Sequence, residues 1–252
     1  MDKELTKDLN IFPILLLIAR PAAGKSEIIE FLSDMNPIDR KNNFHLGKIK
    51  VIDDFPFLWR WFEEDHLLSQ MSQERLFTDE EGYFKFIHQW DLLILLINLE
   101  YNKFLRDEKY SDEYTVILEF SRGKDHGGYN RAFPILSDEI LDKLSILYVN
   151  VSWSESLRKN RKRFNPDKPD SILEHGLPDK KLEHMYSECD FLELADKDNA
   201  YISIRNRNVP YTIFENEDDV TTEYKPALQK RLEDSLNLLW ENRIRQTNCR
   251  RS

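Results

Sequence analysis

The sequence predicts an α/β fold in which helices cover both faces of a mainly parallel sheet of about five strands, giving three α/β/α layers. Apolar and β-branched runs recur along the 252-residue chain, and stretches with helical spacing separate them. The first run, Ile14–Ala19, contains no polar residue, which is typical of a strand buried on both faces. Seven glycines, ten prolines and 40% apolar residues favour a folded chain. We expect one domain over residues 1–252.

The expected elements follow one another in a strand–helix order. After Ile14–Ala19, apolar residues at helical spacing occupy Glu27–Leu32, and "KIKVIDDF" (Lys48–Phe55) is the second strand. Pro56 suits the first turn of a helix, and the pattern from Phe57 to about Glu108 is mostly helical, with a polar break near Thr78–Gly82. Further strands are expected at Tyr114–Phe120, at Ser145–Ser152 and within Tyr201–Asn216 (as "PYTIF"), and further helices at Arg131–Lys143, from Ser152 to Asn165 and at Lys225–Arg245.

Charge and composition exclude several classes of protein. A formal net charge of −10 disfavours non-specific binding to nucleic acid or to an anionic membrane. The two cysteines, Cys189 and Cys249, give neither a disulfide framework nor the spacing of a zinc site. The N-terminal residues lack the layout of a signal peptide, and no apolar run approaches the roughly 20 residues that span a bilayer. We therefore expect a soluble, cytoplasmic protein that binds neither nucleic acid nor membrane; its oligomeric state stays open.

The most specific motif lies where the first strand ends. In "ARPAAGKSE" the residues Gly24-Lys25-Ser26 match the end of a G-x-x-x-x-G-K-[ST] phosphate loop, with Ala19 at the position of its first glycine. A loop between a buried strand and a helix offers backbone N–H groups and a positive helix end to an anion. The alternative is an ordinary helix start. We expect phosphate binding by Ala22, Ala23, Gly24, Lys25, Ser26 and Glu27, with Mg²⁺ on the Ser26 hydroxyl.

Polar residues also follow the other expected parallel strands, whose carboxyl ends meet at one edge of the sheet. Asp53 and Asp54 point in opposite directions on a strand; we expect Asp53 to orient or deprotonate an acceptor hydroxyl and Asp54 to cap the next helix. Glu119 is expected to hold Mg²⁺ through water or to fix Arg122. The alternative is a Glu119–Arg122 salt bridge that only shapes the loop.

These motifs, in this order, resemble the P-loop kinases of nucleosides, nucleotides and related small metabolites, within the superfamily of P-loop nucleoside triphosphate hydrolases. "VIDDFPFLWRW" looks like the acidic residue, proline and aromatic helix of deoxynucleoside kinases. "LEFSRG" is similar in residue types to their acid-Arg-Ser element, although Phe120 and Ser121 separate Glu119 from Arg122. "SLRKNRKRF" looks like the arginine-rich helix of a lid, which places a lid-like insertion around residues 153–187.

The resemblance implies a kinase that uses ATP and Mg²⁺ and transfers the γ-phosphate to a small acceptor such as a nucleoside or nucleotide. Lys25 and Asp53 would then be catalytic, and Arg122 would contact the acceptor. Arg158 and Arg161 lie on one side of a helix and would close over ATP, unless they form a solvated basic face. The alternative function is a non-catalytic nucleotide-binding switch, or a slow ATPase, that acts on a protein partner.

Two further sets of side chains have two interpretations each. Trp59, Trp61 and Phe62 could stack on an acceptor base, although aromatic residues at helical spacing more often belong to the core. His126 lies in the glycine-containing loop after the third expected strand, where contacts with an acceptor are plausible. We expect it instead to be a surface residue of that loop.

Overall fold

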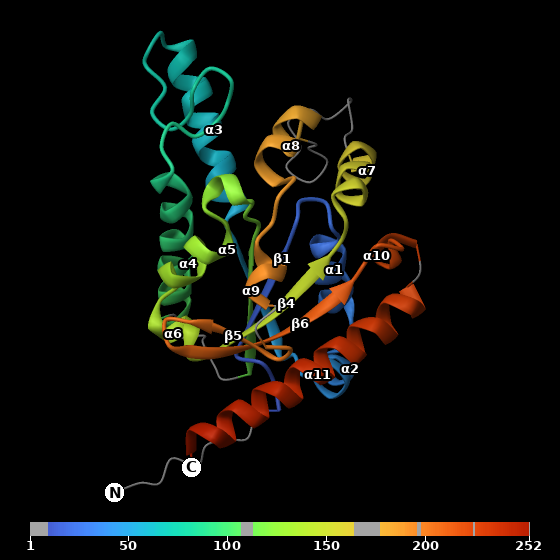
Figure 1. Ribbon diagram of the computed structural model, residues 1–252. Coiled ribbons are helices and arrows are strands. Elements are labelled where there is room, and N and C mark those ends of the chain that lie inside the picture. The colour runs from blue at the N-terminus through green and yellow to red at the C-terminus, as the bar shows by residue number, and fades with distance from the viewer. Residues whose placement is uncertain (1–9, 107–112, 164–176, 196–197, 224, 252) are drawn as a thin grey trace, which may run out of the picture.

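The computed structural model describes residues 10–106, 113–163, 177–195, 198–223 and 225–251. It confirms an α/β fold: one six-stranded sheet, in the order β2-β3-β1-β4-β6-β5, has helices on both faces (Figure 1). The strands are β1 (Ile14–Ala19), β2 (Lys48–Asp53), β3 (Tyr114–Phe120), β4 (Leu144–Asn150), β5 (Tyr201–Ile204) and β6 (Arg207–Glu215). All neighbouring pairs are parallel except β5 and β6.

The helices fill the connections between strands. They are α1 (Lys25–Asp34), α2 (Pro37–Phe44), α3 (Phe55–Gln70), α4 (His88–Arg106), α5 (Gly128–Ala132), α6 (Asp138–Leu141), α7 (Trp153–Arg163), α8 (Asp179–Tyr186), α9 (Phe191–Ala195), α10 (Val220–Glu223) and α11 (Lys225–Arg251), with 3₁₀ turns η1 (Lys124–His126) and η2 (Phe133–Ile135). Within the described residues, no helix is both long and apolar enough to cross a membrane.

The sixth strand was not expected, because Tyr201–Asn216 forms a hairpin and not one strand. Arg205 and Asn206 adopt positive φ angles of 47° and 65°, which reverse the chain between β5 and β6. Two consecutive positive φ angles are typical of a tight hairpin turn, but glycine usually provides them. Without a glycine at this position, the turn has no strong sequence signal.

Two expected helical stretches are divided. The pattern from Phe57 to Glu108 forms α3 and α4, and residues 71–87 between them contain the expected polar break near Thr78–Gly82. The expected helix Arg131–Lys143 is divided into short pieces around Pro134, because a proline has no N–H group for the helix ladder. Ser137 then caps α6, since its Oγ accepts a hydrogen bond from the backbone N–H of Ile140.

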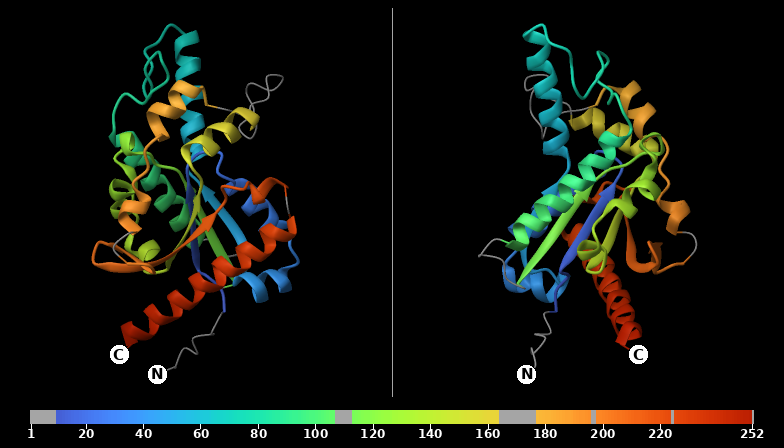
Figure 2. Two further views of the ribbon diagram at one scale, coloured as in Figure 1. Left: turned by 45° about the vertical axis from the view of Figure 1, so that its right-hand side comes forward. Right: turned by 90° about the vertical axis from the view of Figure 1, so that its left-hand side faces the viewer.

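The central strand β1 explains the unbroken apolar run in the sequence, because all six of its residues are buried. Ile14, Leu16 and Ile18 belong to the core cluster that includes residues of α4, α5, α6 and α9. The alternate side chains, among them Leu15 and Leu17, belong to the cluster with α1, α2 and α11, and Figure 2 shows α11 lying across that face. A strand covered on both faces has no position at which a polar side chain reaches water.

The connections also determine which edge of the sheet is open to a ligand. From β1 the chain passes to β2 on one side, whereas from β4 it passes to β6 on the other side. Such a reversal leaves a crevice beyond the carboxyl ends of the adjacent strands. The helices α3, α7 and α8 stand above this edge (Figures 1 and 2).

One buried carboxylate connects α3 to the segment that follows it. Asp65 is fully buried, and its two oxygens accept hydrogen bonds from the backbone N–H of Leu76 at 2.6 Å and from the N–H and hydroxyl of Thr78 at 2.6 and 2.7 Å. We expect Asp65→Asn to lower the free energy of unfolding by about 2 kcal/mol, because an amide places a donor against these donors. Urea denaturation measures the change. The exposed Asp79→Asn is the control, because the amide oxygen of asparagine still accepts the hydrogen bond from the Tyr83 N–H; equal midpoints for the two variants would contradict the assignment.

Candidate functional site

The loop between β1 and α1 has a conformation that requires glycine at position 24. Gly24 immediately precedes α1 with a φ of 107°. A Cβ atom at Gly24 would lie 2.6 Å from Thr221 Oγ1 and 2.7 Å from Asn216 Nδ2, so both the backbone angle and the space exclude a side chain. Ala22 also has a positive φ, of 56°. Glycine at position 24 therefore lets the loop turn into α1 while it packs against Asn216 and Thr221.

The carbonyl groups of this loop are held by side chains from other elements. The Tyr129 hydroxyl donates to the carbonyl of Ala19 at 3.1 Å, and Asn216 Nδ2 donates to that of Ala23 at 2.8 Å. By contrast, within the described residues the backbone N–H groups of residues 22–26 donate no hydrogen bond. Unpaired N–H groups at the start of a helix form a site for an anion.

The loop is also fixed to the two helices above it. Arg20 donates hydrogen bonds to the backbone carbonyls of Val151 and Ser187, which lie just before α7 and just after α8. The Ser156 hydroxyl, on α7, donates to the carbonyl of Pro21 at 2.8 Å. Three separate segments therefore hold the loop in place, so its N–H groups keep their orientation before any ligand binds.

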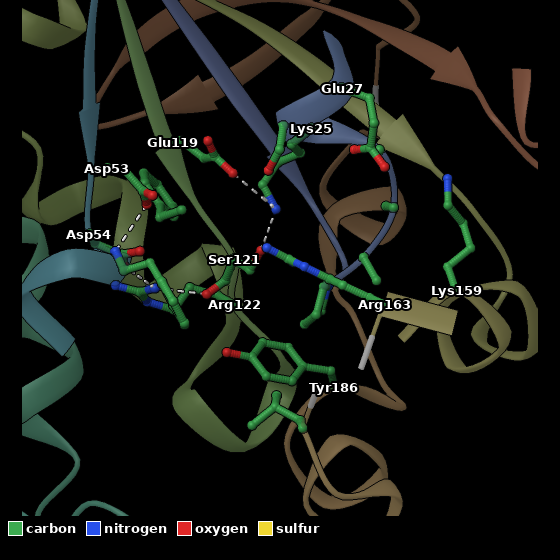
Figure 3. Close-up of a pocket in the computed structure, with 18 of the residues that line it drawn as sticks. Lys25, Glu27, Asp53, Asp54, Glu119, Ser121, Arg122, Lys159, Arg163 and Tyr186 are labelled. Carbon is green, nitrogen blue, oxygen red and sulfur yellow. Dashed lines mark hydrogen bonds and ion pairs between the residues drawn. The ribbon is translucent and has the colours of Figure 1, made fainter. Parts of the chain in front are cut away.

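Lys25 is the first residue of α1, and its ammonium group lies inside a cavity at the strand ends. Its Nζ donates to Ser121 Oγ at 2.9 Å and lies 3.6 Å from Glu119 Oε1 (Figure 3). Of the two expected roles of Glu119, holding Mg²⁺ through water and fixing Arg122, the second is wrong, because Glu119 pairs with Lys25. The reason is strand geometry: Glu119 and Ser121 are two residues apart and face α1, whereas Phe120 and Arg122 face the other side.

Asp53 ends β2 beside Glu119, its direct partner in the parallel register of β2 and β3. The side chain is half-buried, and its Oδ1 accepts a hydrogen bond from the backbone N–H of Phe55 at 2.9 Å. Burial, followed by the charges of Glu119 and Asp54, raises the pKa of Asp53 to about 8. Asp53 is therefore a carboxyl group that changes protonation near neutral pH.

Asp54 has a different role from the expected helix cap. Its carboxylate makes no capping hydrogen bond, and Oδ2 instead accepts from Arg122 at 2.7 Å in a buried ion pair. Arg122 also donates to the carbonyl of Trp90, and its guanidinium lies 5.1 Å from the Trp90 ring. Burial raises the pKa of Asp54, and the Arg122 guanidinium opposes this shift. Arg122 lines the cavity with its charge already paired.

The expected arginines of α7 are not among the residues that line the cavity. Arg158 pairs with Glu155 and Asp219 at 2.6 and 2.8 Å, and Arg161 pairs with Asp179 at 2.7 Å. The basic residues of α7 that line the cavity are Lys159, Lys162 and Arg163. These three share a side of the helix because they are spaced by three and four residues. The composition of the helix predicted a basic face, but its rotation about the helix axis is set by packing.

These side chains surround a cavity of ≈ 510 Å³, which is in the size range of small-molecule sites. The sequence-predicted residues that line it are Ala22, Ala23, Gly24, Lys25, Ser26, Glu27, Asp53, Glu119 and Arg122. Sequence reasoning missed Ser121, the cations of α7 and Tyr186. For Ser121, its two-residue spacing from Glu119 was an available signal; for Tyr186, on α8, there was none.

A magnesium ion in this cavity would need ligands from phosphate oxygens as well as from the protein. No group of three or more His, Cys, Asp or Glu side chains that could hold a metal occurs in the part of the chain that the structure describes. Ser26 is exposed at the start of α1, whereas Glu119 is engaged by Lys25. Mg²⁺ usually keeps several waters and is bound by one or two carboxylates together with phosphate oxygens, so the Ser26 hydroxyl would supply only part of such a site.

Comparison with known proteins adds no family to this description. No protein-family model matches the chain, and no curated protein matches it. The functional argument therefore depends on the geometry of the cavity.

Proposed function

We propose that this protein is a P-loop kinase, an ATP-dependent phosphotransferase that moves the γ-phosphate of MgATP to a small hydroxyl- or phosphate-bearing metabolite, with nucleosides and nucleotides as the first class to test. The observation that carries the proposal is the position of Lys25. Its ammonium lies in the same cavity as the unpaired N–H groups of residues 22–26, with Glu119 and Ser121 holding it. Cation and N–H groups together match the needs of a nucleoside triphosphate.

The loop would bind the phosphates through its backbone. The N–H groups of residues 22–26 and the positive end of α1 would face phosphate oxygens, and the missing side chain at Gly24 lets the loop pack closely against Asn216 and Thr221. Lys25 would exchange its contact with Glu119 for one with the outer phosphates. The Ser26 hydroxyl would hold Mg²⁺, which supplies charge neutralisation at those phosphates.

Asp53 is the group that we assign to the acceptor. Phosphoryl transfer depends mainly on alignment and on stabilisation of charge, and a base near the operating pH helps the acceptor hydroxyl to lose its proton. Asp53 meets this requirement because its pKa is raised to about 8. Asp54 is less suited to the role, since Arg122 pairs with its carboxylate at 2.7 Å.

Lys159, the third cation of α7 at the cavity, is already paired with Asp219 at 2.6 Å. Lys162 and Arg163 border the cavity from the same helix and take the place that we expected for Arg158 and Arg161. In the proposed reaction they would stabilise the charge that develops on the transferred phosphate, and α7 with α8 would act as a lid that excludes water.

The direct test is ADP release from MgATP in the presence of nucleosides, nucleoside monophosphates and small sugar or vitamin alcohols. We expect one class to raise the rate by about tenfold or more over basal hydrolysis, because an aligned acceptor competes with water. ATP that binds without stimulation by any acceptor would favour the nucleotide-dependent switch or slow ATPase. Failure to bind ATP would contradict both functions.

A further inference from the structure

The side chain of Asn216 lies behind the loop between β1 and α1, on the side away from the cavity. Asn216 directly follows β6, is fully buried and is not among the residues that line the cavity. Its Nδ2 donates to the carbonyl of Ala23 at 2.8 Å, so it contacts the loop at the residue before Gly24. The sequence did not indicate this contact, because 193 residues separate its two partners.

The hydrogen bond to Ala23 determines the direction of the next N–H group. Ala23 and Gly24 are joined by a trans peptide, in which the carbonyl and the N–H group point in opposite directions. Because the carbonyl of Ala23 points to Asn216 behind the loop, the N–H group of Gly24 points to the other side. Gly24 lines the cavity, and its N–H group donates no hydrogen bond within the described residues. This N–H group is therefore available to an anion in the cavity.

Without this hydrogen bond, the peptide between Ala23 and Gly24 would be free to turn over. Turning a peptide plane changes the φ angle of the residue that follows it, and glycine adopts φ angles of either sign with similar ease. Within the described residues, side chains hold the loop carbonyls of Ala19, Pro21 and Ala23, and only the last belongs to a peptide that ends at a glycine. A turned peptide would point a carbonyl oxygen, with its partial negative charge, at the phosphates.

Thr221 holds the amide of Asn216 in this orientation. The backbone N–H of Thr221 donates to Asn216 Oδ1 at 3.3 Å, and Asn216 Nδ2 also donates to Thr221 Oγ1 at 2.9 Å. Since a backbone N–H group can only donate, the atom that faces it is the amide oxygen, which leaves Nδ2 for the carbonyl of Ala23. Thr221 Oγ1 accepts a further hydrogen bond from Lys159 Nζ at 3.2 Å. The protein alone therefore sets the direction of the amide, before any ligand binds.

We propose that Asn216 is a positioning residue of the phosphate site: its amide locks the peptide so that the N–H group of Gly24, and not the carbonyl of Ala23, faces the phosphates. Asn216 does not touch the ligand and acts through the loop. The inference rests on the proposed function, because the same loop is assigned there to the phosphates of ATP.

A single labelled peptide reports this orientation. Ala23 and Gly24 form the only Ala-Gly step in the sequence, so ¹³C in alanine carbonyls and ¹⁵N in glycine give one signal in an HNCO spectrum. Tripolyphosphate is the probe, because it carries phosphates without a base. In the wild type we expect it to bind, to move the Gly24 amide proton downfield and to slow its exchange with water, since the anion becomes its acceptor. Binding that leaves this signal unchanged would overturn the inference.

The matched comparison is between Asn216→Ala and Asn98→Ala. Asn98 is 8% exposed and lies outside the cavity; its Nδ2 donates to the Ile135 carbonyl at 2.8 Å, and its Oδ1 accepts from the Ser137 N–H at 3.1 Å. Each variant thus loses a buried amide with backbone partners, and both should lower the midpoint of urea denaturation.

Only Asn216→Ala should change the phosphate site. We expect it to weaken tripolyphosphate binding by about tenfold to a hundredfold, the loss of one hydrogen bond to a charged group, and to abolish the shift of the Gly24 amide. Asn98→Ala should bind the probe like the wild type and show the same shift. Titration calorimetry under conditions where both variants are folded gives the affinities. The wild-type spectrum needs no variant, so it decides the question if Asn216→Ala does not fold.

The outcomes distinguish this inference from the kinase proposal. If Asn216→Ala binds tripolyphosphate as tightly as Asn98→Ala does, the role of Asn216 is wrong and the phosphate loop stands. If the wild type does not bind tripolyphosphate, the phosphate loop is wrong, and both proposals fail with it. If the variants behave as expected but no acceptor raises ADP release, the phosphotransferase function fails and the positioning role of Asn216 stands.

Discussion

Replacing Lys25 with alanine is expected to lower acceptor-stimulated ADP release by about a thousandfold, since it removes the main charge-stabilising donor from the loop. ATP binding should weaken as well. The variant loses the ammonium group of Lys25, which donates to Ser121 Oγ at 2.9 Å. It also leaves Glu119 in the cavity without this cation, which lies 3.6 Å from Oε1 in the wild type. An unpaired carboxylate would repel the phosphates that enter beside it.

A double variant separates these two effects. Lys25→Ala with Glu119→Gln should recover part of the ATP affinity that Lys25→Ala loses, but little of the rate, because the repulsion is gone and the cation is still missing. Lys50→Ala, at an exposed position of β2, is the control for loss of a lysine from the sheet. Titration calorimetry with ATP and the ADP-release assay give the two readouts. An unchanged dissociation constant for ATP in Lys25→Ala would show that the loop does not bind phosphate.

Asp53→Asn is expected to lower acceptor-stimulated turnover by about 10²- to 10⁴-fold, the usual contribution of a general base, with ATP affinity retained. The pH profile gives a sharper test. Only the ionised carboxylate accepts a proton, so kcat/KM of the wild type should rise with pH up to about pH 8, where Asp53 titrates, and then level off. The asparagine variant should show a flat profile in this range. Asp34→Asn, an exposed residue at the end of α1, controls for loss of charge.

The raised pKa can also be checked without substrate. Between about pH 4 and pH 8 the folded protein keeps a proton on Asp53 that the unfolded chain releases. The free energy of unfolding should therefore fall as the pH rises through this interval, and Asp53→Asn should make the decline shallower. Urea denaturation at pH 5 and pH 8 measures both slopes; identical slopes would contradict the assigned pKa and with it the proposed base.

The sequence predicted the parts of the site that depend on strand direction and local pattern. The buried strand β1, the loop that ends at Lys25 and the acids at Asp53 and Glu119 all follow from apolar runs and from the meeting of parallel strands at one edge. Each of these features is a pattern within a few consecutive residues, so it can be recognised without knowing which distant residues it contacts. The expected convergence of strand ends accordingly appears in the structure.

What the sequence did not predict depends on distant partners. The cavity-facing side of α7 is set by the packing of Lys159 against Asp219, 60 residues further along the chain, with Nζ and Oδ1 2.6 Å apart. Arg122 pairs with Asp54 on another strand end, and His126 is buried by Trp90. No local pattern encodes such pairings, because each side chain looks like an ordinary surface residue until its partner is placed.

Arg20 has a consequence for how the molecule can move. Its guanidinium joins the loop before α1 to the backbone at Val151 and Ser187, the two points where the chain enters α7 and leaves α8. The Ser156 hydroxyl also holds α7 to the loop, at the carbonyl of Pro21. Any movement of α7 and α8 is therefore restrained where the chain enters α7 and leaves α8, and truncating Arg20 would release these two points and the loop together.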